Sequence, residues 1–467
     1  MKQGRLDCGR TMNGQSKGIE TRSLCPACLA TIPATIREGP SGAIMEKRCP
    51  DHGSFHAVVS SDLDTYRGLC QSARKVTKPD RYGAHTVKGC PDDCGLCPSH
   101  EQHTCLGILE ITSRCDLQCP VCLASSLPAG QDLEVHVAEA ALNALIRNEG
   151  RPPPLQLSGG EPSLHPDLET IIESASSLGY EKIEIDTNGR RLARDPSFAG
   201  RLREAGLSQV YLQMDGLDSS VSEFIRGADL VEDKHRAIEH CKRAGLQVAL
   251  SVTVVPGVNE HCLWQMIRFG MEQGLAGINF QSVTLSGRFP ESLCQGPERF
   301  TLGHFIRGVE RQSGGRLLAS ELTPLPCPDP RCGVMTYALI LEGELVPLNR
   351  ILEDDALLEH VADMNDWDAV IRQVQLEGAC GCGPTAACSG PPADLPGLFD
   401  EADYYSIGFH GMMDAFNFDL DRARHCCIHE LAPDGRLIPF CLYNIKYRGL
   451  GSKGRGHEQG KARLPGR

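Results

Sequence analysis

Between residues 106 and 287, short runs rich in Val, Ile and Leu alternate with longer segments in which apolar residues recur every three or four positions. The short runs predict buried strands, and the longer period predicts amphipathic helices. We predict strands at 107–113, 155–158, 182–186, 209–214, 247–254 and 277–283. Predicted helices fill the intervals at 132–148, 166–178, 197–205, 231–244 and 259–273.

Strands that alternate with helices are typical of a parallel α/β sheet. Six such units predict a partial (βα)6 barrel over residues 106–287. An open doubly wound sheet is the alternative, because periodicity alone does not decide whether a sheet curls into a barrel.

The rest of the chain divides around this region. We expect residues 1–22 and 449–467 to be disordered, residues 23–60 to form a small metal-binding domain, and 61–105 to be a linker with a further cysteine motif. Residues 288–448 form a cysteine-rich C-terminal region, with a hairpin predicted at 336–341 and 344–347 and a helix at 360–375.

Composition excludes several classes of protein. The chain has 467 residues and a formal net charge of −13, which argues against nucleic acid as a partner. The start of the chain has no apolar run of the signal-peptide kind, and no stretch of about 18 apolar residues predicts a membrane span. The final residues are basic, so a peripheral contact with anionic phospholipid is a further option.

Twenty-three cysteines are the unusual feature of the composition. They cluster at metal-ligand spacings in a long chain, so metal centres in a reducing cytoplasm explain them better than disulfides. We therefore expect a cytoplasmic protein, with membrane association as an addition rather than a requirement.

The first candidate site is Cys115, Cys119 and Cys122, in the loop after the first predicted barrel strand. Three thiolates hold three irons of a [4Fe-4S] cluster and leave the fourth iron open to a ligand. A structural zinc knuckle is the alternative, but it needs a fourth protein ligand.

A second motif follows one strand later, where Gly159-Gly160-Glu161-Pro162 ends the second predicted strand. Adjacent glycines let backbone approach a ligand closely, although most such pairs are merely turns. Polar residues also end the third and fourth strands, at the edge where parallel sheets bind ligands. Candidates there for ribose or substrate contacts are Thr187, Asn188, Gln213 and Asp215, and helix caps and turns explain each of them equally well.

Three further cysteine groups are candidate metal sites. The first resembles a zinc ribbon or rubredoxin-like site, in which Cys25, Cys28 and Cys49 hold one metal with His52 or another cysteine. The second is Cys90, Cys94 and Cys97, an auxiliary [4Fe-4S] site or a zinc site, with Cys105 within reach as fourth ligand and a cysteine from the C-terminal region as the alternative. The third, assigned to one more cluster, is Cys327, Cys332, Cys427 and Cys441, for which buried unligated cysteine is the rival interpretation.

Together the Cys-x3-Cys-x2-Cys loop and the Gly-Gly-Glu-Pro motif resemble those of the radical S-adenosylmethionine (SAM) superfamily. The resemblance implies that the open iron chelates SAM, that Gly159, Gly160 and Glu161 hold the SAM amino group, and that the segment from Val252 to Asn259 lines the adenine. It also implies a reducing partner such as ferredoxin or flavodoxin. Val121 departs from the pattern, since many members carry an aromatic residue before the third cysteine.

The order of all motifs from about residue 22 to 448 resembles a narrower branch, that of archaeal tetraether lipid synthase. Some members of this branch are identified instead as 7,8-dihydro-6-hydroxymethylpterin methyltransferases. The branch implies a mononuclear iron at the N-terminal site, where spacing alone does not separate iron from zinc, and auxiliary [4Fe-4S] clusters elsewhere.

Three functions follow as hypotheses. Radical C–C coupling of lipid alkyl chains comes first and predicts a long apolar tunnel that reaches the cysteine loop. Radical methylation of a pterin-like small molecule predicts instead a compact polar pocket. A non-catalytic iron-sulfur electron carrier is the third, and the Gly-Gly-Glu-Pro motif argues against it.

Overall fold

The computed structural model describes residues 18–72, 76–294, 299–325, 327–350 and 403–448. The predicted helix at 360–375 lies outside these residues, as do Cys380, Cys382 and Cys388 and most of the two segments expected to be disordered.

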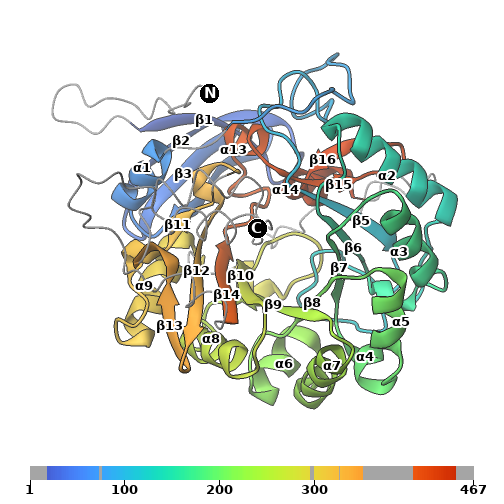
Figure 1. Ribbon diagram of the computed structural model, residues 1–467. Helices are drawn as coiled ribbons and strands as arrows, with labels where there is room; N and C mark the ends of the chain where they lie inside the picture. Colours follow the sequence, from blue (N-terminus) through green and yellow to red (C-terminus); the bar gives the residue numbers. More distant parts are fainter. Residues whose placement is uncertain (1–17, 73–75, 295–298, 326, 351–402, 449–467) are drawn as a thin grey trace, which may run out of the picture.

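All six predicted barrel strands are present, and each pairs in parallel with the next in chain order. They form the curved sheet at the centre of Figure 1. The strands are β5 (Leu106–Thr112), β6 (Leu155–Gly159), β7 (Ile183–Thr187), β8 (Gln209–Gln213), β9 (Gln247–Val254) and β10 (Gly277–Ser282).

The C-terminal region extends this sheet at both edges. Strand β14 (Asp403–His410) pairs in parallel with β10, and β15 (Ile428–Leu431) pairs in parallel with β5. Beyond β14 lie β12 (Gly333–Leu341), β11 (Thr323–Pro324) and β13 (Glu344–Pro347), and beyond β15 lies β16 (Leu437–Pro439). Strands β12 and β13 are the predicted hairpin. Among the described residues no pairing joins the two edges, so the barrel is partial.

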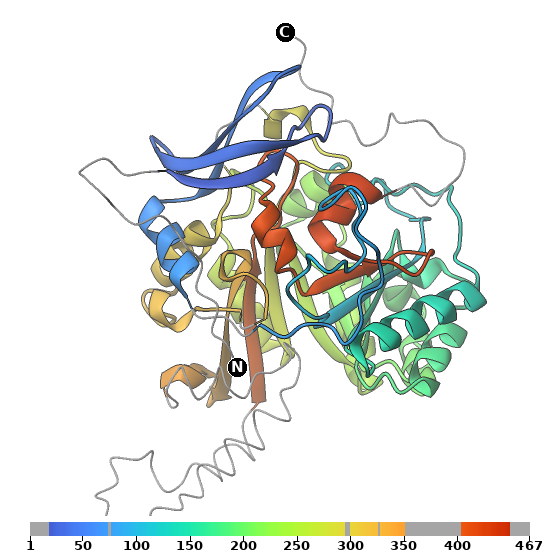
Figure 2. The same cartoon turned by 90° about the horizontal axis from the view of Figure 1, so that it is seen from above.

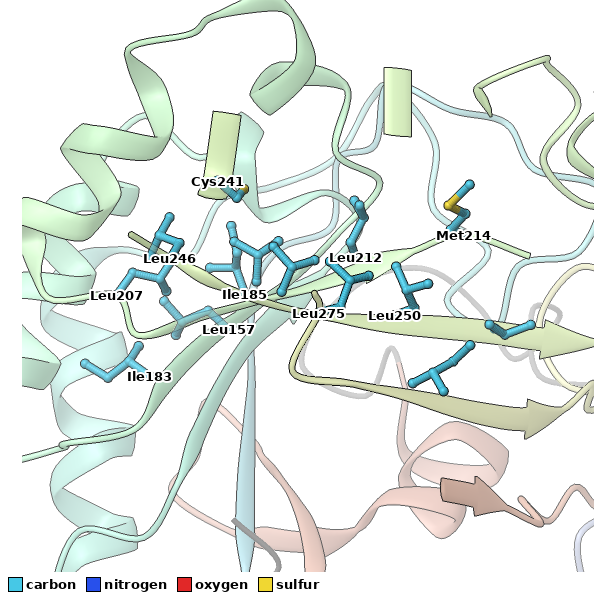
Figure 3. Packing of buried hydrophobic residues seen from close by; sticks show 14 of the residues in the cluster. Leu157, Ile183, Ile185, Leu207, Leu212, Met214, Cys241, Leu246, Leu250 and Leu275 are labelled. Carbon is cyan, nitrogen blue, oxygen red and sulfur yellow. The ribbon is translucent and has the colours of Figure 1, made fainter. Parts of the chain in front are cut away.

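Helices cover the outer face of the sheet, and apolar residues on alternate strand positions pack beneath them. Figure 3 shows Ile183, Ile185, Leu212 and Leu250 from three strands in one layer with Cys241 of the covering helix. The helices after the barrel strands are α2 (Val135–Glu149), α3 (Leu168–Ser177), α4 (Arg190–Arg194), α5 (Phe198–Ala205), α6 (Ser219–Arg226), α7 (Val231–Arg243), α8 (Leu263–Glu272) and α9 (Leu302–Ser313). All five predicted helices are among them, and α8 begins four residues later than predicted because Asn259 is buried in the preceding turn.

A four-stranded antiparallel sheet forms the N-terminal domain, with β1 (Ile19–Leu24), β2 (Thr31–Gly39), β3 (Gly42–Cys49) and β4 (Gly53–Ser60) in chain order. The prediction of disorder through residue 22 is wrong at its end, because Ile19 pairs with Ile36 and packs into a small core. In Figure 2 this blue sheet lies beside the red helical part of the C-terminal region, and β1 packs against the helix α13 (Leu420–Arg424).

Buried polar contacts join the two parts of the chain. Lys47 Nζ donates to the carbonyl oxygen of Ala415 at 2.7 Å. Arg331 donates to Tyr66 of α1 (Leu63–Gln71) at 3.0 Å and to Asp419 at 3.2 Å, just before α13 (Leu420–Arg424). The short helix α14 (Phe440–Leu442) follows β16. No helix in the described part of the chain combines the length and apolar character that a membrane crossing requires.

Candidate active site

The three cysteines after β5 lie in a loop whose backbone is fixed by its neighbours. Cys115 N–H donates to Leu127 O at 2.9 Å, and Cys122 exchanges two backbone hydrogen bonds with Arg288 at 2.8 and 2.9 Å. Arg288 Nε also donates to Cys119 O at 2.6 Å. These contacts use backbone atoms, so all three thiols stay available to a metal cluster. The apolar cluster around them contains no further cysteine among the described residues, as a cluster with one open iron requires.

The two glycines of the second motif pass directly against this loop. Gly160 N–H donates to Thr112 O at 2.7 Å, and Glu161 N–H donates to Arg114 O at 2.8 Å. A Cβ added to Gly159 would lie 2.1 Å from Thr112 O, and one added to Gly160 would lie 2.1 Å from Arg114 O. Both glycines are therefore required for the end of β6 to lie beside the cysteine loop.

Glu161 is buried, and its carboxylate is fully engaged. It accepts hydrogen bonds from Thr187 Oγ1 at 2.6 Å, Asn188 N at 2.7 Å and Ser163 N at 3.0 Å. Burial raises the pKa of this carboxyl, and the hydrogen bonds from Ser163, Thr187 and Asn188 oppose the shift. The side chain thus joins β6 to the end of β7, and the backbone around the glycines is left to accept hydrogen bonds from a bound ammonium group.

Asn188 connects the same region to the cysteine loop. Its Nδ2 donates to Asp116 Oδ1 at 2.8 Å, and Asp116 also forms an ion pair with Arg190 at 2.6 Å. Lys234 Nζ, which is buried, donates to Asn188 O at 2.5 Å and to Gln213 Oε1 at 3.1 Å. Burial lowers the pKa of Lys234 to about 8. The candidates Thr187, Asn188 and Gln213 therefore belong to one hydrogen-bonded network.

Asp215 holds an arginine beside the cysteine loop. Arg226 Nε and Nη2 donate to the two oxygens of Asp215 at 2.7 and 2.9 Å. The guanidinium also contacts the thiol of Cys119. Burial raises the pKa of Cys119, and the charge of Arg226 opposes that shift. Sequence reasoning found Asp215 and missed Arg226, because the arginine comes from the end of α6 and has no motif around it.

An apolar patch lies next to these charges. Val121 packs with Val221, Ile225 and Val255 in one buried cluster. Val255 belongs to the segment expected to line the adenine. Many superfamily members carry an aromatic residue at the position of Val121. In this chain, aliphatic side chains from α6 and the end of β9 pack around Val121 instead.

The concave face of the sheet carries polar side chains. The Nδ2 of Asn279 on β10 donates to Tyr211 Oη on β8 at 2.7 Å. Their neighbours along each strand, among them Leu212 and Phe280, pack in the core beneath the helices, so Asn279 and Tyr211 lie on the opposite, concave face. Asp186 is the register partner of Tyr211. Glu184 lies on the same face and accepts hydrogen bonds from Gln156 and Gln209 at 2.7 and 2.8 Å. Burial raises the pKa of both carboxyls to about 7.

Two polar groups on this face have no partner among the described residues. Asp186 makes no hydrogen bond there, and its carboxyl experiences the charges of Glu161, Arg226 and Lys234. His410 Nδ1 lies 2.8 Å from Asn279 Oδ1, while its buried Nε2 has no partner. The sequence analysis did not single out either residue. A signal for Asp186 was present, because it lies two positions after Glu184 in a strand whose other residues are mostly apolar.

The N-terminal candidate site comes together as predicted, with His52 as the fourth donor. His52 Nδ1 lies 3.4 Å from Cys49 Sγ and 3.8 Å from Cys25 Sγ, and Cys28 Sγ lies 3.9 Å from Cys49 Sγ. All four donor atoms are within 4.8 Å of one another, which fits one tetrahedral metal ion.

The auxiliary cysteines group differently from the sequence prediction. Cys90, Cys94 and Cys97 line one pocket together with His100, as a single site requires. Cys105 does not join them, because its thiol makes hydrogen bonds with those of Cys327 and Cys427. His100 lines the same pocket, where its Nε2 lies 2.9 Å from Cys426 O and 3.1 Å from His429 Nε2.

The predicted set of Cys327, Cys332, Cys427 and Cys441 is likewise divided. Cys327 and Cys427 lie with Cys105 in one buried cluster. The thiols of Cys332 and Cys441 instead interact electrostatically with that of Cys426, which sequence reasoning left out. The adjacent residues Cys426 and Cys427 therefore belong to two different groups of cysteines, which the spacing of cysteines in the sequence does not predict.

Comparison with known proteins agrees with this site. A family model described as the radical SAM superfamily matches residues 109–270, and one described as the HMPTM N-terminal zinc ribbon domain matches residues 19–61. The chain is 33% identical, over 92% of its length and 94% of the relative, to 7,8-dihydro-6-hydroxymethylpterin dimethyltransferase of Methanocaldococcus jannaschii.

Other matches are more partial. A probable GTP 3′,8-cyclase of Methanothermobacter thermautotrophicus is 30% identical over 36% of this chain and 53% of its own length. The solved structure of Streptococcus suis SuiB bound to S-adenosylmethionine aligns with 46% of this chain and 48% of that chain, at 14% identity and a TM-score of 0.38.

Proposed function

Because the chain belongs to the radical SAM superfamily, in the family of the pterin dimethyltransferase from M. jannaschii, we propose that it is a radical SAM methyltransferase of a pterin-like heteroaromatic substrate. Its family implies a [4Fe-4S] cluster and SAM, for which Cys115, Cys119 and Cys122 provide the fitting donor set. When bound, this cluster supplies the electron that cleaves SAM to a 5′-deoxyadenosyl radical. What the chain itself contributes is binding, orientation and exclusion of water.

The unpaired carboxylate of Asp186 carries the proposal for the substrate. It lies on the polar concave face, next to Tyr211 and within the field of Arg226 and Lys234. The carboxylate of Asp186 is half-buried and has no hydrogen-bond partner among the described residues, so it is available to a ligand that donates hydrogen bonds. Glu184 is already held by two glutamines, so Asp186 is the carboxylate left to a ligand.

A pterin matches this requirement. Its pyrimidine ring presents an N–H and an exocyclic amino group side by side, and one carboxylate accepts both hydrogen bonds in a planar, bidentate arrangement. The phenol ring of Tyr211 and the free Nε2 of His410 offer a stacking surface and a further polar contact on the same face. Binding there would orient the substrate below the cysteine loop at the carboxyl ends of the strands.

The residues around the SAM position have separate tasks. The backbone at Gly159 and Gly160 accepts from the amino group, Glu161 holds that backbone against β7, and Val121 with Val255 provides an apolar wall for the adenine. Arg226 places a positive charge at Cys119. These roles are independent of the substrate, so they hold for any reaction that begins with SAM cleavage.

The lipid hypothesis makes a different demand on the same face. Coupling of alkyl chains needs a long apolar channel to the cysteine loop, whereas Glu184, Asp186, Tyr211 and Asn279 make the described concave face polar. A channel for alkyl chains would leave the carboxylate of Asp186 unpaired, which is costly for a charged group against an apolar ligand. The polar lining therefore favours pterin methylation over lipid coupling.

The experiment compares substrates and one matched pair of variants. Reconstituted protein is reduced with dithionite under anaerobic conditions, and 5′-deoxyadenosine is quantified with 7,8-dihydro-6-hydroxymethylpterin, with phospholipid extract or with neither. We expect the pterin to stimulate SAM cleavage, Asp186→Asn to abolish the stimulation, and Asp195→Asn on the surface to preserve it. Stimulation by phospholipid alone contradicts the proposal.

A further inference from the structure

We propose that His103, Cys105, Cys327 and Cys427 form a second mononuclear metal site that binds one Zn²⁺ or Fe²⁺ ion and holds no iron-sulfur cluster. The site lies at the start of β5 and β15 and is distinct from the Cys25, Cys28, Cys49 and His52 site.

Three of the donors come together closely in a buried location, and the fourth, Cys427, lies beside two of them. His103 Nε2 lies 3.5 Å from Cys105 Sγ, and the donor atoms of His103, Cys105 and Cys327 are all within 4.8 Å of one another. The thiol of Cys427 makes side-chain hydrogen bonds with those of Cys105 and Cys327. The three cysteines are at most 2% exposed, so the site is closed to bulk water. His103, Cys105 and Cys327 have the spacing of ligands to one ion, and a shift of the Cys427 thiol toward His103 would complete a tetrahedral set of the kind found in structural zinc sites.

The spacing of the donors distinguishes one ion from a cluster. A tetrahedral ion with metal–sulfur bonds of about 2.3 Å places its ligand atoms about 3.8 Å apart. A cube of four irons and four sulfides keeps its thiolates much farther apart. Among the described residues, close spacing occurs here and at the N-terminal site, but not at the Cys115 loop or among Cys90, Cys94 and Cys97.

The surroundings of His103 fit the role of a ligand. Its Nδ1 lies 3.6 Å from Glu149 Oε2, on the side opposite to the thiols. Glu149 is itself fixed, because Oε1 accepts a hydrogen bond from Thr104 N at 3.0 Å. Metal-bound histidines commonly place their second nitrogen against a carboxylate in this way, which orients the ring and fixes its tautomer.

The position in the fold indicates what such an ion would do. Cys105 and Cys427 immediately precede the adjacent strands β5 and β15, and Cys105 N–H donates to Cys427 O at 2.8 Å. Cys327 comes from the segment before β12. One ion would thus join three segments that are distant in sequence and hold the edge strand β15 on the barrel. It lies at the end of β5 opposite to the Cys115 loop, so its role is structural.

Metal and sulfide analysis of the full chain tests the proposal. Wild type, Cys105→Ser and Cys327→Ser are purified and reconstituted anaerobically, and zinc, iron and acid-labile sulfide are counted per chain. We expect each serine variant to lose one metal ion and no sulfide. The control Cys241→Ala, a buried cysteine on α7, loses neither. Loss of about four irons together with sulfide would show a cluster, and unchanged metal content would show no site; either result overturns the proposal.

A second experiment remains decisive if the serine variants do not fold. Cys28→Ser empties the N-terminal site at an exposed cysteine, and X-ray absorption then reports the remaining mononuclear ion. We expect three sulfurs at about 2.3 Å and one nitrogen at about 2.0 Å. Adding His103→Cys to Cys28→Ser should retain the ion with four sulfurs. Absence of a mononuclear ion in Cys28→Ser contradicts the proposal.

Discussion

The carboxylate of Glu161 accepts a hydrogen bond from the backbone N–H of Asn188 at 2.7 Å, which fixes the glycine motif after β6 to the end of β7. Asn188 in turn reaches Asp116 in the cysteine loop at 2.8 Å. Three loops that follow three different strands are therefore one rigid unit. The glutamate of the motif acts here as a positioning group. A substitution of Glu161 should therefore weaken SAM binding by disturbing the loops that bind it.

Replacing Glu161 with glutamine puts an amide NH2 in place of one carboxylate oxygen, either Oε2, which accepts from Asn188 N, or Oε1, which accepts from Ser163 N. One buried N–H loses its acceptor, at a cost of about 1–3 kcal/mol, so we expect SAM to bind roughly tenfold or more weakly. Equilibrium dialysis of SAM against reconstituted protein measures the effect. Glu169→Gln, at a half-exposed ion pair with Arg201, is the control and should leave the affinity unchanged. Equal affinity in both variants would show that the bond to Asn188 is dispensable.

Gly160→Ala tests the packing of the glycine motif on the cysteine loop. The new Cβ would lie 2.1 Å from Arg114 O, so the loop must move. We expect loss of the SAM-binding cluster, seen as about four fewer irons per chain after reconstitution. Gly200→Ala has no atom within 4 Å of the added Cβ and should retain full iron content. Full iron content in both variants would contradict the role given to Gly160.

Arg226 should influence the reduction potential of the cluster through Cys119. A positive charge beside a thiolate stabilises the reduced form, so Arg226→Met is expected to lower the potential by on the order of 50 mV. Arg226→Lys keeps the positive charge, so its cluster should have a reduction potential close to that of the wild type. Redox titration followed by electron paramagnetic resonance measures both variants. A potential that rises in Arg226→Met would contradict this assignment.

Asp186 gives a prediction about pH and stability. Burial raises its folded pKa to about 7, so between about pH 4 and pH 7 the folded state holds a proton that the unfolded state has lost. Stability therefore falls as pH rises across this window. Asp186→Asn should raise the midpoint of thermal unfolding more at pH 8 than at pH 6, by a stability gain of about 1 kcal/mol or more.

The control for this effect is Asp195→Asn. Hydrogen bonds from Ser197 lower the pKa of Asp195 to about 2, so its charge is favourable at both pH values. We expect no stabilisation of this variant at either pH. An Asp186→Asn variant that is no more stable than wild type at pH 8 would show that the carboxylate is paired in solution.

The sequence was sufficient for those parts of the structure that depend on local periodicity and short-range motifs. Strands β5 to β10, the hairpin of β12 and β13 and the N-terminal metal site all follow from spacing within a short segment. Sequence alone did not indicate the structural contacts of Glu161 and Asp215. Both were predicted as ligand contacts, and in the structure both carboxylates also hold neighbouring residues in place.

The remaining features depend on segments that are far apart in the chain. Strands β14 and β15 extend the sheet at opposite edges, although less than twenty residues separate them. No local sequence pattern predicts this placement. The same topology brings Cys105 to Cys327 and Cys427 and separates Cys426 from its neighbour. Cysteine spacing therefore predicts which cysteines lie together within one loop, but it does not predict groups whose members each come from a different strand end.

A competition experiment tests the central claim most directly. Reconstituted protein, dithionite, SAM as radical source and a methyl donor, which is either further SAM or a methylene-bearing reduced pterin, are incubated anaerobically with 7,8-dihydro-6-hydroxymethylpterin and archaeal and bacterial phospholipid in one reaction. Both substrates are then analysed by mass spectrometry. Our account predicts a pterin that has gained the mass of one or more methyl groups, with lipid masses unchanged. Lipid pairs that have each lost two hydrogens, beside an unmodified pterin, would contradict it.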